Sequence, residues 1–488
     1  MNPNKNKFAT FYAIGLILLF IFGCKKVDDF GEINNNPGAT TSPVTSALLT
    51  NVLSAIPGQQ VFDGGGASSV SGLFCQYFAE TQYTESSRYQ KQTISWDAFY
   101  SGVVYDLQNI INYNSAPGTA DIAAKYGANR NQIAISRILK AYYFWVFTDR
   151  WGDIPYSEAL KGNGTPKYDR QEDIYSDLLK ELKAAVAQFD DAGLPFSGDI
   201  LYGGDNAKWK KLANSMRMMI SLRMSKSNPG TGKNEFAAAL NDAAGSINTN
   251  ADNAGLKYPG GAFQNPVYNY YDVVKRKDYA VAKTVTDILV NTSDPRATAF
   301  GSSTVGFPYG LERDQAVTFA NSNVNWARVV EGSRRVETSP LYFITASQML
   351  LARAEAAQLG WTSENPGTLY NSAIKANFEQ WGVYSDVAFN AYISRTDISL
   401  AGGSELQKIG IQRWLSHFPD GNQGWSEWRR TGFPVLIPAP GTTGGIPRRF
   451  AYGNNEPALN PKNYSIAASF YTVAGEMDSQ NAKIWWDK

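Results

Sequence analysis

The chain has 488 residues, and its 45 basic and 44 acidic side chains leave a formal net charge of +1. A chain this close to neutral lacks the basic surface that nucleic-acid binding needs, which argues against DNA or RNA as a partner. A catalytic triad or a histidine-rich metal site is hard to build with the single histidine, His417. We predict no cofactor and no metal site built on side chains of this kind, and we expect His417 to end a helix. No twelve-residue calcium loop is evident, and the sequence leaves calcium binding open.

The first 23 residues are typical of a signal peptide. Two lysines precede an apolar stretch over residues 8–22, which is too short for a membrane-spanning helix and ends at Gly23 and Cys24 in a pattern that resembles a bacterial lipobox. Two or three acyl chains on Cys24 would anchor the protein stably, because each buried methylene contributes about 0.8 kcal/mol. We predict lipidation at Cys24 and a tether over residues 24–45. The alternative is an ordinary secretory signal with a chance cysteine.

The second cysteine, Cys75, has no partner if Cys24 carries lipid, so we expect no intrachain disulfide. A chain of this length can bury a large core without a disulfide. Cys75 is therefore expected to be a small buried hydrophobe.

Helical periodicity recurs along the chain, at 96–111, 132–147, 169–189, 208–224, 340–357, 367–381 and 404–418. The second segment is apolar almost all round near its end, which predicts a buried central helix. Asp169 and Glu172 give the third segment a start that is typical of a capping box. We expect Asp205 or Asn206 to cap the fourth segment, and Gly360 to lie just beyond the end of the fifth.

These helices occur in pairs with short polar breaks, which favours a mainly α fold, a superhelix of tetratricopeptide type. No clean 34-residue repeat is evident, so this prediction depends on helix spacing. Two segments, 245–340 and 432–463, are rich in turn residues and are expected to be ordered, loop-rich excursions from the helices.

A series of motifs matches one known family. They occur at 29–37, 149–156, 202–215, 352–357 and 485–487, and the strongest are Glu427-Trp428-Arg429-Arg430-Thr431-Gly432-Phe433-Pro434 and Pro447-Arg448-Arg449-Phe450. In their order and spacing they resemble the SusD/RagB superfamily, in the branch of SusD-like lipoproteins, from Cys24 to the end of the sequence. Residues 25–29, two lysines followed by two acids, are similar to the surface-export signal of Bacteroidetes lipoproteins.

The resemblance implies a single SusD-like helical domain over residues 46–488, with tetratricopeptide-like units and loops packed over one side. It also implies a SusC-like, TonB-dependent transporter as partner, on which the lipoprotein sits as a hinged lid. The ligand would be an oligosaccharide or a peptide, and the protein would be anchored in the outer membrane, facing the cell exterior, without catalysing a reaction.

A glycan site needs flat aromatic faces with polar side chains beside them. The candidates outside the helical stripes are Tyr83, Tyr270, Tyr271 and Trp326, together with Trp96 at a helix start and Arg276 in a mixed-charge segment. Trp326 is the preferred candidate because amides and hydroxyls surround it in the sequence. The Trp428-Arg429-Arg430 motif is expected instead to join the C-terminal segment to the helices, because guanidinium groups stack on indoles and bind carbonyls.

Two other classes of protein compete with this interpretation. A surface glycoside hydrolase of helical fold needs two carboxylates at a defined separation, and 44 acidic residues cannot exclude such a pair. An adhesin or structural surface module is the third possibility.

Overall fold

The structure is a computed structural model that describes residues 42–60 and 66–488. The predicted signal peptide, the lipidation site at Cys24 and the tether up to residue 41 lie outside the described residues. From Val44 to Lys488 the chain forms one compact unit.

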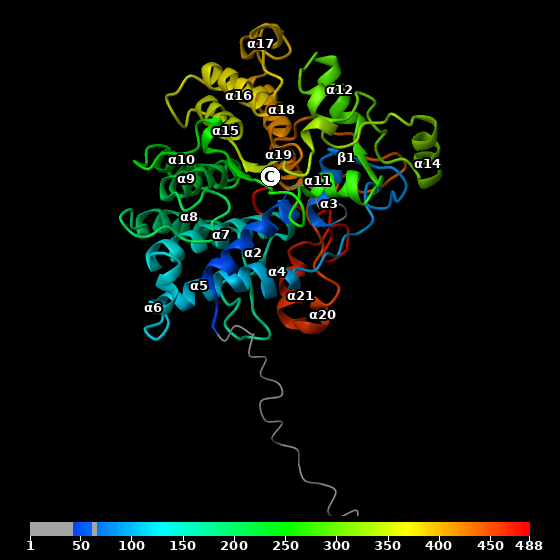
Figure 1. Cartoon of the computed structure of the whole chain (residues 1–488). Helices are drawn as coiled ribbons and strands as arrows, with labels where there is room; N and C mark the ends of the chain where they lie inside the picture. The colour runs from blue at the N-terminus through cyan, green and yellow to red at the C-terminus, as the bar shows by residue number, and fades with distance from the viewer. Residues whose placement is uncertain (1–41, 61–65) are drawn as a thin grey trace, which may run out of the picture. The chain divides into compact units, whose positions relative to one another are not determined.

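The described chain is mainly helical, as predicted, and its long helices pack on their neighbours in sequence. Helix α7 contacts α8, α8 contacts α9, and α9 contacts α10; further along, α15 packs on α16 and α18 on α19. Figure 1 shows α5 to α10, α15 and α16 stacked along one side of this unit. The bounds are α5 Tyr105–Ser115, α7 Asn129–Trp151, α8 Gln171–Gln188, α9 Asn206–Arg223, α10 Pro229–Leu240, α15 Ala346–Gln358, α16 Pro366–Gln380, α18 Glu405–His417 and α19 Gly421–Thr431.

The predicted central helix is confirmed. Helix α7 contacts α5, α8 and α9, and nearly every side chain from Ala134 to Trp151 is buried. The first predicted helix is interrupted, because the π-helical turn η2 (Tyr100–Val104) separates α4 (Asp97–Phe99) from α5 and Gly102 departs from helical geometry.

The helix ends follow most of the sequence signals. The carboxylate of Asp205 accepts hydrogen bonds from the backbone N–H groups of Ala207 and Lys208 at the start of α9. Gly360 lies just after α15 with a φ of 70°, a left-handed conformation that glycine adopts without steric cost. His417 is the last residue of α18.

The predicted capping box at Asp169 is wrong. Asp169 belongs to strand β3 (Tyr168–Asp169), which pairs with β2 (Ile154–Pro155), and its carboxylate accepts from the backbone N–H of Ser157 at 2.7 Å. Helix α8 begins two residues later, where the Asp153 carboxylate accepts from the Gln171 N–H at 2.9 Å. The carboxylate of Asp153, which precedes β2, therefore caps the start of α8 in place of a side chain from the helix start itself.

The predicted helix at 340–357 begins too early. Its first residues form strand β6 (Leu341–Ile344), antiparallel to β4 (Ala254–Leu256), and Thr345 then caps α15 in a capping box with Gln348. The excursion at 245–340 also holds more regular structure than expected, with α11 (Pro266–Tyr268), η5 (Asn269–Val273), β5 (Tyr279–Val281), α12 (Lys283–Asn291), α13 (Ala297–Phe300), α14 (Arg313–Ser322) and η6 (Gly332–Arg334). Near the C-terminus, 432–463 contains α20 (Glu456–Leu459) and the start of α21 (Pro461–Ser469).

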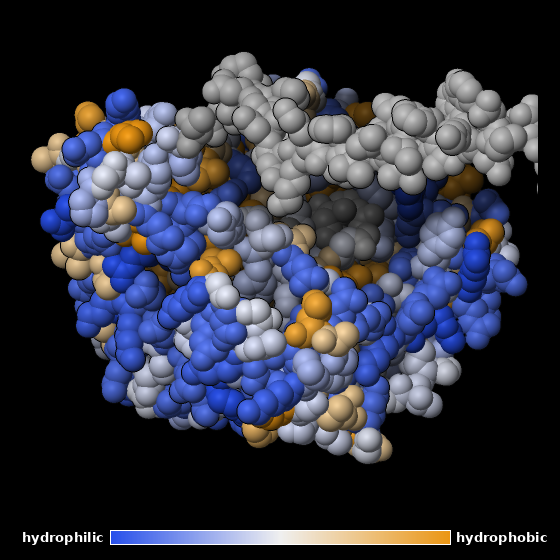
Figure 2. Space-filling view, turned by 90° about the horizontal axis from the view of Figure 1, so that it is seen from below, coloured by the Kyte–Doolittle hydropathy of each residue, from blue (hydrophilic) through white to orange (hydrophobic). Residues whose placement is uncertain are grey.

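Several helices were not predicted, namely α2 (Thr45–Gln60), α3 (Ala67–Phe74), α6 (Ala120–Ala123), α10, α17 (Asp386–Ile393) and α19. Helix α19 packs on α3 so closely that a Cβ on Gly421 would lie 2.3 Å from the backbone nitrogen of Gly72. Cys75 follows α3 and is fully buried, as expected. On the face shown in Figure 2, hydrophobic residues stand singly or in small groups among hydrophilic ones. No helix within the described ranges has the length and apolar character to cross a bilayer.

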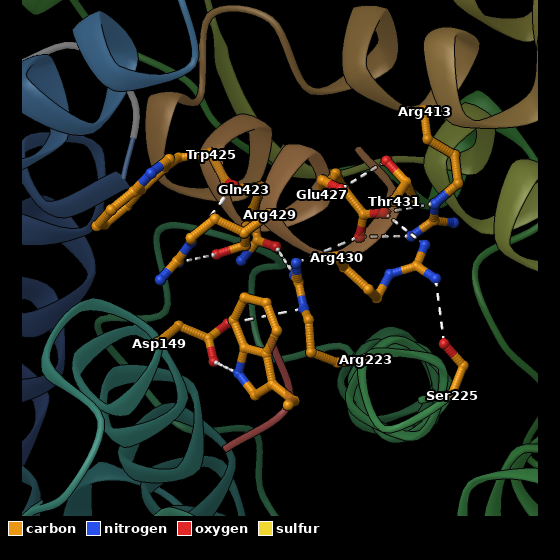
Figure 3. A network of polar contacts seen from close by, with 12 residues as sticks. Asp149, Arg223, Ser225, Arg413, Gln423, Trp425, Glu427, Arg429, Arg430 and Thr431 are labelled. Atoms are coloured by element: carbon orange, nitrogen blue, oxygen red, sulfur yellow. Dashed lines mark hydrogen bonds and ion pairs between the residues drawn. The ribbon is translucent and has the colours of Figure 1, made fainter. Parts of the chain in front are cut away.

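Helix α19 lies at the centre of a buried network of charges (Figure 3). Arg413 binds the carboxylate of Glu427 with two hydrogen bonds of 2.9 and 2.8 Å, and Arg430 binds it at 2.7 Å. Arg430 also holds the carboxylate of Glu355, and Arg223 lies 3.4 Å from Glu427. Burial alone would raise the pKa of Glu427, but the charges of Arg413, Arg430 and Arg223 outweigh it and hold that pKa well below its usual value.

The structural role predicted for the Trp-Arg-Arg motif is confirmed. The Arg429 guanidinium lies 3.7 Å from the ring centre of Trp425 and 4.8 Å from that of Trp486. It also donates to the carbonyl oxygen of Arg448 at 2.8 Å. The motif thus joins the C-terminal segment to the helices.

His417 allows a simple test of burial in this core. Burial lowers the pKa of His417 to about 3, so the imidazole is neutral in the folded protein. Because the pKa in the unfolded chain is near 6.5, this group contributes stability above that pH, and the contribution is lost as the pH falls, by up to about 1.4 kcal/mol per unit. NMR of histidine-labelled protein should show one imidazole signal that stays neutral from pH 8 to pH 5. A titration midpoint near 6.5 would contradict the burial.

Candidate binding cleft

A cleft of about 650 Å³ opens between the segment that follows β1 (Phe78–Glu80), the loop before β5 and helix α14. Three of the predicted ligand contacts, Tyr83, Arg276 and Trp326, line it together. In Figure 1 this region lies at the side of the molecule opposite to the stacked helices, near the labels β1 and α14.

Strands β1 and β5 bring the two loops of the cleft together. The strands are antiparallel, with Glu80 opposite Tyr279, and the N–H of Thr81 donates to the carbonyl oxygen of Asp278 at 2.8 Å. Residues 81–83 and 275–278 therefore leave the same end of one buried ribbon, although they lie far apart in the sequence. This pairing fixes the spacing of the cleft walls.

The aromatic side chains of the cleft differ in exposure. Tyr83 is 49% exposed, and the Arg313 guanidinium lies 5.2 Å from its ring centre. Trp326 is only 4% exposed and packs edge-on against Phe307, with the Arg328 guanidinium 4.9 Å from its ring centre. Tyr83 thus offers a ring to a ligand, whereas Trp326 forms part of the wall.

The other two tyrosine candidates, Tyr270 and Tyr271, form hydrogen bonds with the end of the loop before β5 and with the first residue of β5. The hydroxyl of Tyr270 lies 3.2 Å from the carboxylate of Asp278 and accepts from the Asp278 N–H at 3.1 Å. The hydroxyl of Tyr271 donates to the Tyr279 carbonyl at 2.8 Å. Both rings are at most 7% exposed and neither lines the cleft, so they stabilise the backbone beside it and do not contact a ligand in it.

Trp96 lies elsewhere in the fold. It precedes α4, is buried among the rings of Trp151, Tyr168 and Tyr452, and borders a separate cavity of about 230 Å³. The structure does not bring it to the cleft.

Sequence reasoning missed Lys275, Lys277 and Arg328, which also line the cleft. The two lysines belong to the mixed-charge segment that contains Arg276. This segment follows η5 as a loop, in which Lys275 has a φ of 58°. A run of basic residues in a loop-rich region was the available signal, but its position beside Tyr83 depends on the β1–β5 pairing.

A larger cavity of about 840 Å³ lies between α5, α7 and α8. Its four basic and four acidic side chains balance, and Arg137 forms an ion pair with Glu181 at 2.9 Å. The phenol of Tyr156, one of its two aromatic side chains, donates to the carboxylate of Asp177 at 2.7 Å. The charges of this cavity balance and the hydroxyl of Tyr156 is already bound, so the cleft beside β1, with the half-exposed ring of Tyr83, is the stronger candidate.

The cleft has few acidic or metal-binding side chains among its described residues. Asp278 is the one carboxylate among its described lining residues, and it accepts from the Arg276 Nε at 2.6 Å and from the side chain of Gln82. In residues 42–60 and 66–488, no three side chains of the metal-binding kinds gather into a possible metal site.

Glu80, at the end of β1, makes the stability of the fold depend on pH in a way that can be measured. Burial raises the pKa of Glu80 to about 7, while its carboxylate accepts from the Ser87 N–H at 2.8 Å and closes the loop that carries Tyr83. Because the pKa in the unfolded chain is lower, near 4.5, the unfolded chain loses its proton first, and stability falls as the pH rises from about 4.5 to about 7, by about 3 kcal/mol in total.

We expect Glu80→Gln to remove this dependence. Urea unfolding at pH 5 and pH 8 should show that the variant gains stability over the parent protein only at pH 8. A difference between the two proteins that is the same at both pH values would contradict the raised pKa.

The chain is similar to one protein family and to several solved structures. The sequence profile of the SusD-like family, described as starch-binding and associating with the outer membrane, matches residues 35–453. A solved chitin-binding protein is 28% identical, with a TM-score of 0.75 over 91% of this chain and 99% of that one. No curated protein matches the chain.

Two further solved structures are similar in fold. A chitin-binding SusD homologue from Flavobacterium johnsoniae is 23% identical, with a TM-score of 0.75 over 91% of this chain and 98% of that one. A SusD homologue from Bacteroides fragilis is 24% identical, with a TM-score of 0.76 over 92% and 100%. These similarities confirm the predicted helical fold class.

Proposed function

The chain belongs to the SusD-like family, and we propose that it is a surface lipoprotein that captures a glycan in the cleft beside β1. The observation that carries the proposal is the half-exposed ring of Tyr83, held in a cleft with Arg276 and the wall residue Trp326. A sugar ring presents C–H groups to an aromatic face and hydroxyls to the polar side chains around it.

An oligopeptide is the alternative ligand. A peptide in an open cleft gains most from strand addition or from pockets for its side chains. Strands β1 and β5 are buried along their length, so they offer a peptide no free edge at the cleft. This favours the glycan.

We propose that the protein delivers its ligand to a SusC-like, TonB-dependent transporter. Lipid on Cys24 would hold the protein in the outer membrane, facing the cell exterior, and would keep it beside that transporter. The family description, which includes association with the outer membrane, and the lipobox-like sequence support this part of the proposal. Residues 46–488 would then act as a single SusD-like domain, which the compact unit from Val44 onward supports.

The cleft favours binding over hydrolysis. Glycosidases commonly use two carboxyl groups, about 5–9.5 Å apart, one on each side of the scissile bond. The described lining of the cleft provides only Asp278, whose carboxylate is already bound by Arg276. We therefore propose that the protein does not catalyse a reaction.

The proposal can be tested on native protein solubilised in detergent. Mass spectrometry should find a diacylglyceryl group on Cys24, and a large TonB-dependent barrel should co-purify. Calorimetry against a glycan panel should show binding, with no shorter products after long incubation. A free thiol at Cys24 would contradict the anchor, and glycan turnover would contradict the binding role.

A further inference from the structure

The cleft beside β1 carries an excess of positive charge. Four basic side chains and one acidic side chain line it, in contrast to the four of each sign in the larger cavity between α5, α7 and α8. The whole chain is nearly neutral. The excess therefore belongs to this cleft and does not reflect the average composition of the surface.

Asp278, the one acid among the described residues of the cleft, neutralises one of these charges. The carboxylate of Asp278 accepts a hydrogen bond from the Nε of Arg276 at 2.6 Å. Lys275 and Lys277 flank this pair, are exposed, and make no ion pair with any described residue. Lys275 also has a left-handed φ of 58°, which is unfavourable for a residue with a side chain. Two ammonium groups thus stand free on one wall.

Guanidinium groups also lie beside the two aromatic rings of the cleft. Arg328, in the cleft lining, lies 4.9 Å from the ring centre of Trp326, and Arg313, at the start of α14 and outside that lining, lies 5.2 Å from the ring centre of Tyr83. Neither forms an ion pair with an acid in the part of the chain that the structure describes. A guanidinium stacked on an aromatic ring keeps its N–H groups in its own plane, free to bind a carboxylate or a sulfate with two hydrogen bonds.

We infer that the ligand of this cleft is an anionic glycan, one that carries carboxylate or sulfate groups along its chain. The inference rests on the proposed glycan-binding function and narrows its substrate class. A neutral sugar would desolvate these cations without returning a charge, whereas a uronate or a sulfated sugar would pair with them while its ring contacts Tyr83. Starch and chitin, which the family description and two similar structures name, carry no such charge.

The test is calorimetry on the full mature protein with oligosaccharides of matched length. The panel contains an oligogalacturonate, a sulfated galactan oligomer, a neutral glucan and a chitin oligomer, with oligoglutamate as an acidic peptide. We expect one of the anionic oligosaccharides to bind at least tenfold more tightly than the neutral ones. That affinity should fall about tenfold between 50 and 500 mM salt, because salt screens exposed charges.

Variants locate the effect in the cleft. Lys275→Gln with Lys277→Gln should lower the affinity for the anionic oligosaccharide at least tenfold, at an unchanged melting temperature, because both side chains are exposed. The matched control, Lys161→Gln with Lys180→Gln, removes two exposed lysines from the larger cavity and should leave the affinity unchanged.

The outcomes separate the inference from the proposed function. Equal, salt-independent binding of neutral glycans that Tyr83→Ala abolishes would overturn the inference and leave the proposed function standing. Oligoglutamate that binds as tightly as the anionic glycans would overturn the inference, because it would show charge recognition without sugar recognition. No binding by any glycan would overturn both.

Discussion

Glu427→Gln is expected to lower the free energy of unfolding by about 3–5 kcal/mol, the cost of breaking a buried ion pair by removing one partner. The carboxylate of Glu427 faces the guanidinium groups of Arg413, Arg430 and Arg223, all at most 3% exposed (Figure 3). Glutamine keeps the shape of the side chain but removes the charge. Among the described residues, Glu355 would then be the one remaining carboxylate paired with Arg413 and Arg430.

Urea unfolding followed by tryptophan fluorescence measures this effect. Glu181→Gln is the matched control, because Glu181 also binds an arginine, Arg137, with two hydrogen bonds of 2.9 and 3.0 Å. The Glu181 side chain is 39% exposed, so its pair is solvated and its loss should cost less than about 1 kcal/mol. If both variants lost the same free energy of unfolding, burial would not determine how much the ion pairs around α19 contribute to stability.

Tyr83→Ala is expected to weaken ligand binding about 30-fold, which corresponds to a loss of about 2 kcal/mol, typical of a central aromatic contact. The ring is 49% exposed and caps no buried cluster, so the stability of the fold should change by less than about 0.5 kcal/mol. Tyr83→Phe keeps the aromatic face and should retain most of the affinity. Calorimetry with the anionic oligosaccharide gives the affinity, and thermal melting gives the stability.

Trp326 provides the contrasting case. Its ring is 4% exposed and packs on Phe307 and Phe319 through a small apolar cluster, so Trp326→Ala should cost about 3–5 kcal/mol of stability. Loss of binding in that variant would not by itself identify a ligand contact. If Tyr83→Ala binds as tightly as the parent protein, the exposed ring is not part of the site.

The helical scaffold could be predicted from the sequence because the relevant information is local. A helix that buries one face repeats its apolar residues every three or four positions, and α7, α9 and α16 were found in this way with ends within a few residues. Helix α19 was not found, since it buries Glu427, Arg429 and Arg430, whose charges hide the pattern of burial.

The cleft could be predicted only in part, because it depends on contacts between distant segments. The aromatic and basic residues were visible in turn-rich sequence, and Tyr83, Arg276 and Trp326 do meet. Strands β1 and β5 have three residues each, too few to show an alternating pattern. Without their pairing, Lys275 and Lys277 could not be placed beside Tyr83. The start of α8 was missed for the same reason, since Asp153 acts across a turn.

The short ribbon of β1 and β5 has a consequence for how binding preference can change. The two loops of the cleft, residues 81–83 and 275–278, leave adjacent backbone positions at one end of the ribbon, while α14 and the segment after it complete the lining. The ligand preference can therefore be changed by exchanging the two loops together, without changes to the helices. Replacing a single loop would leave it facing a wall shaped for the former ligand.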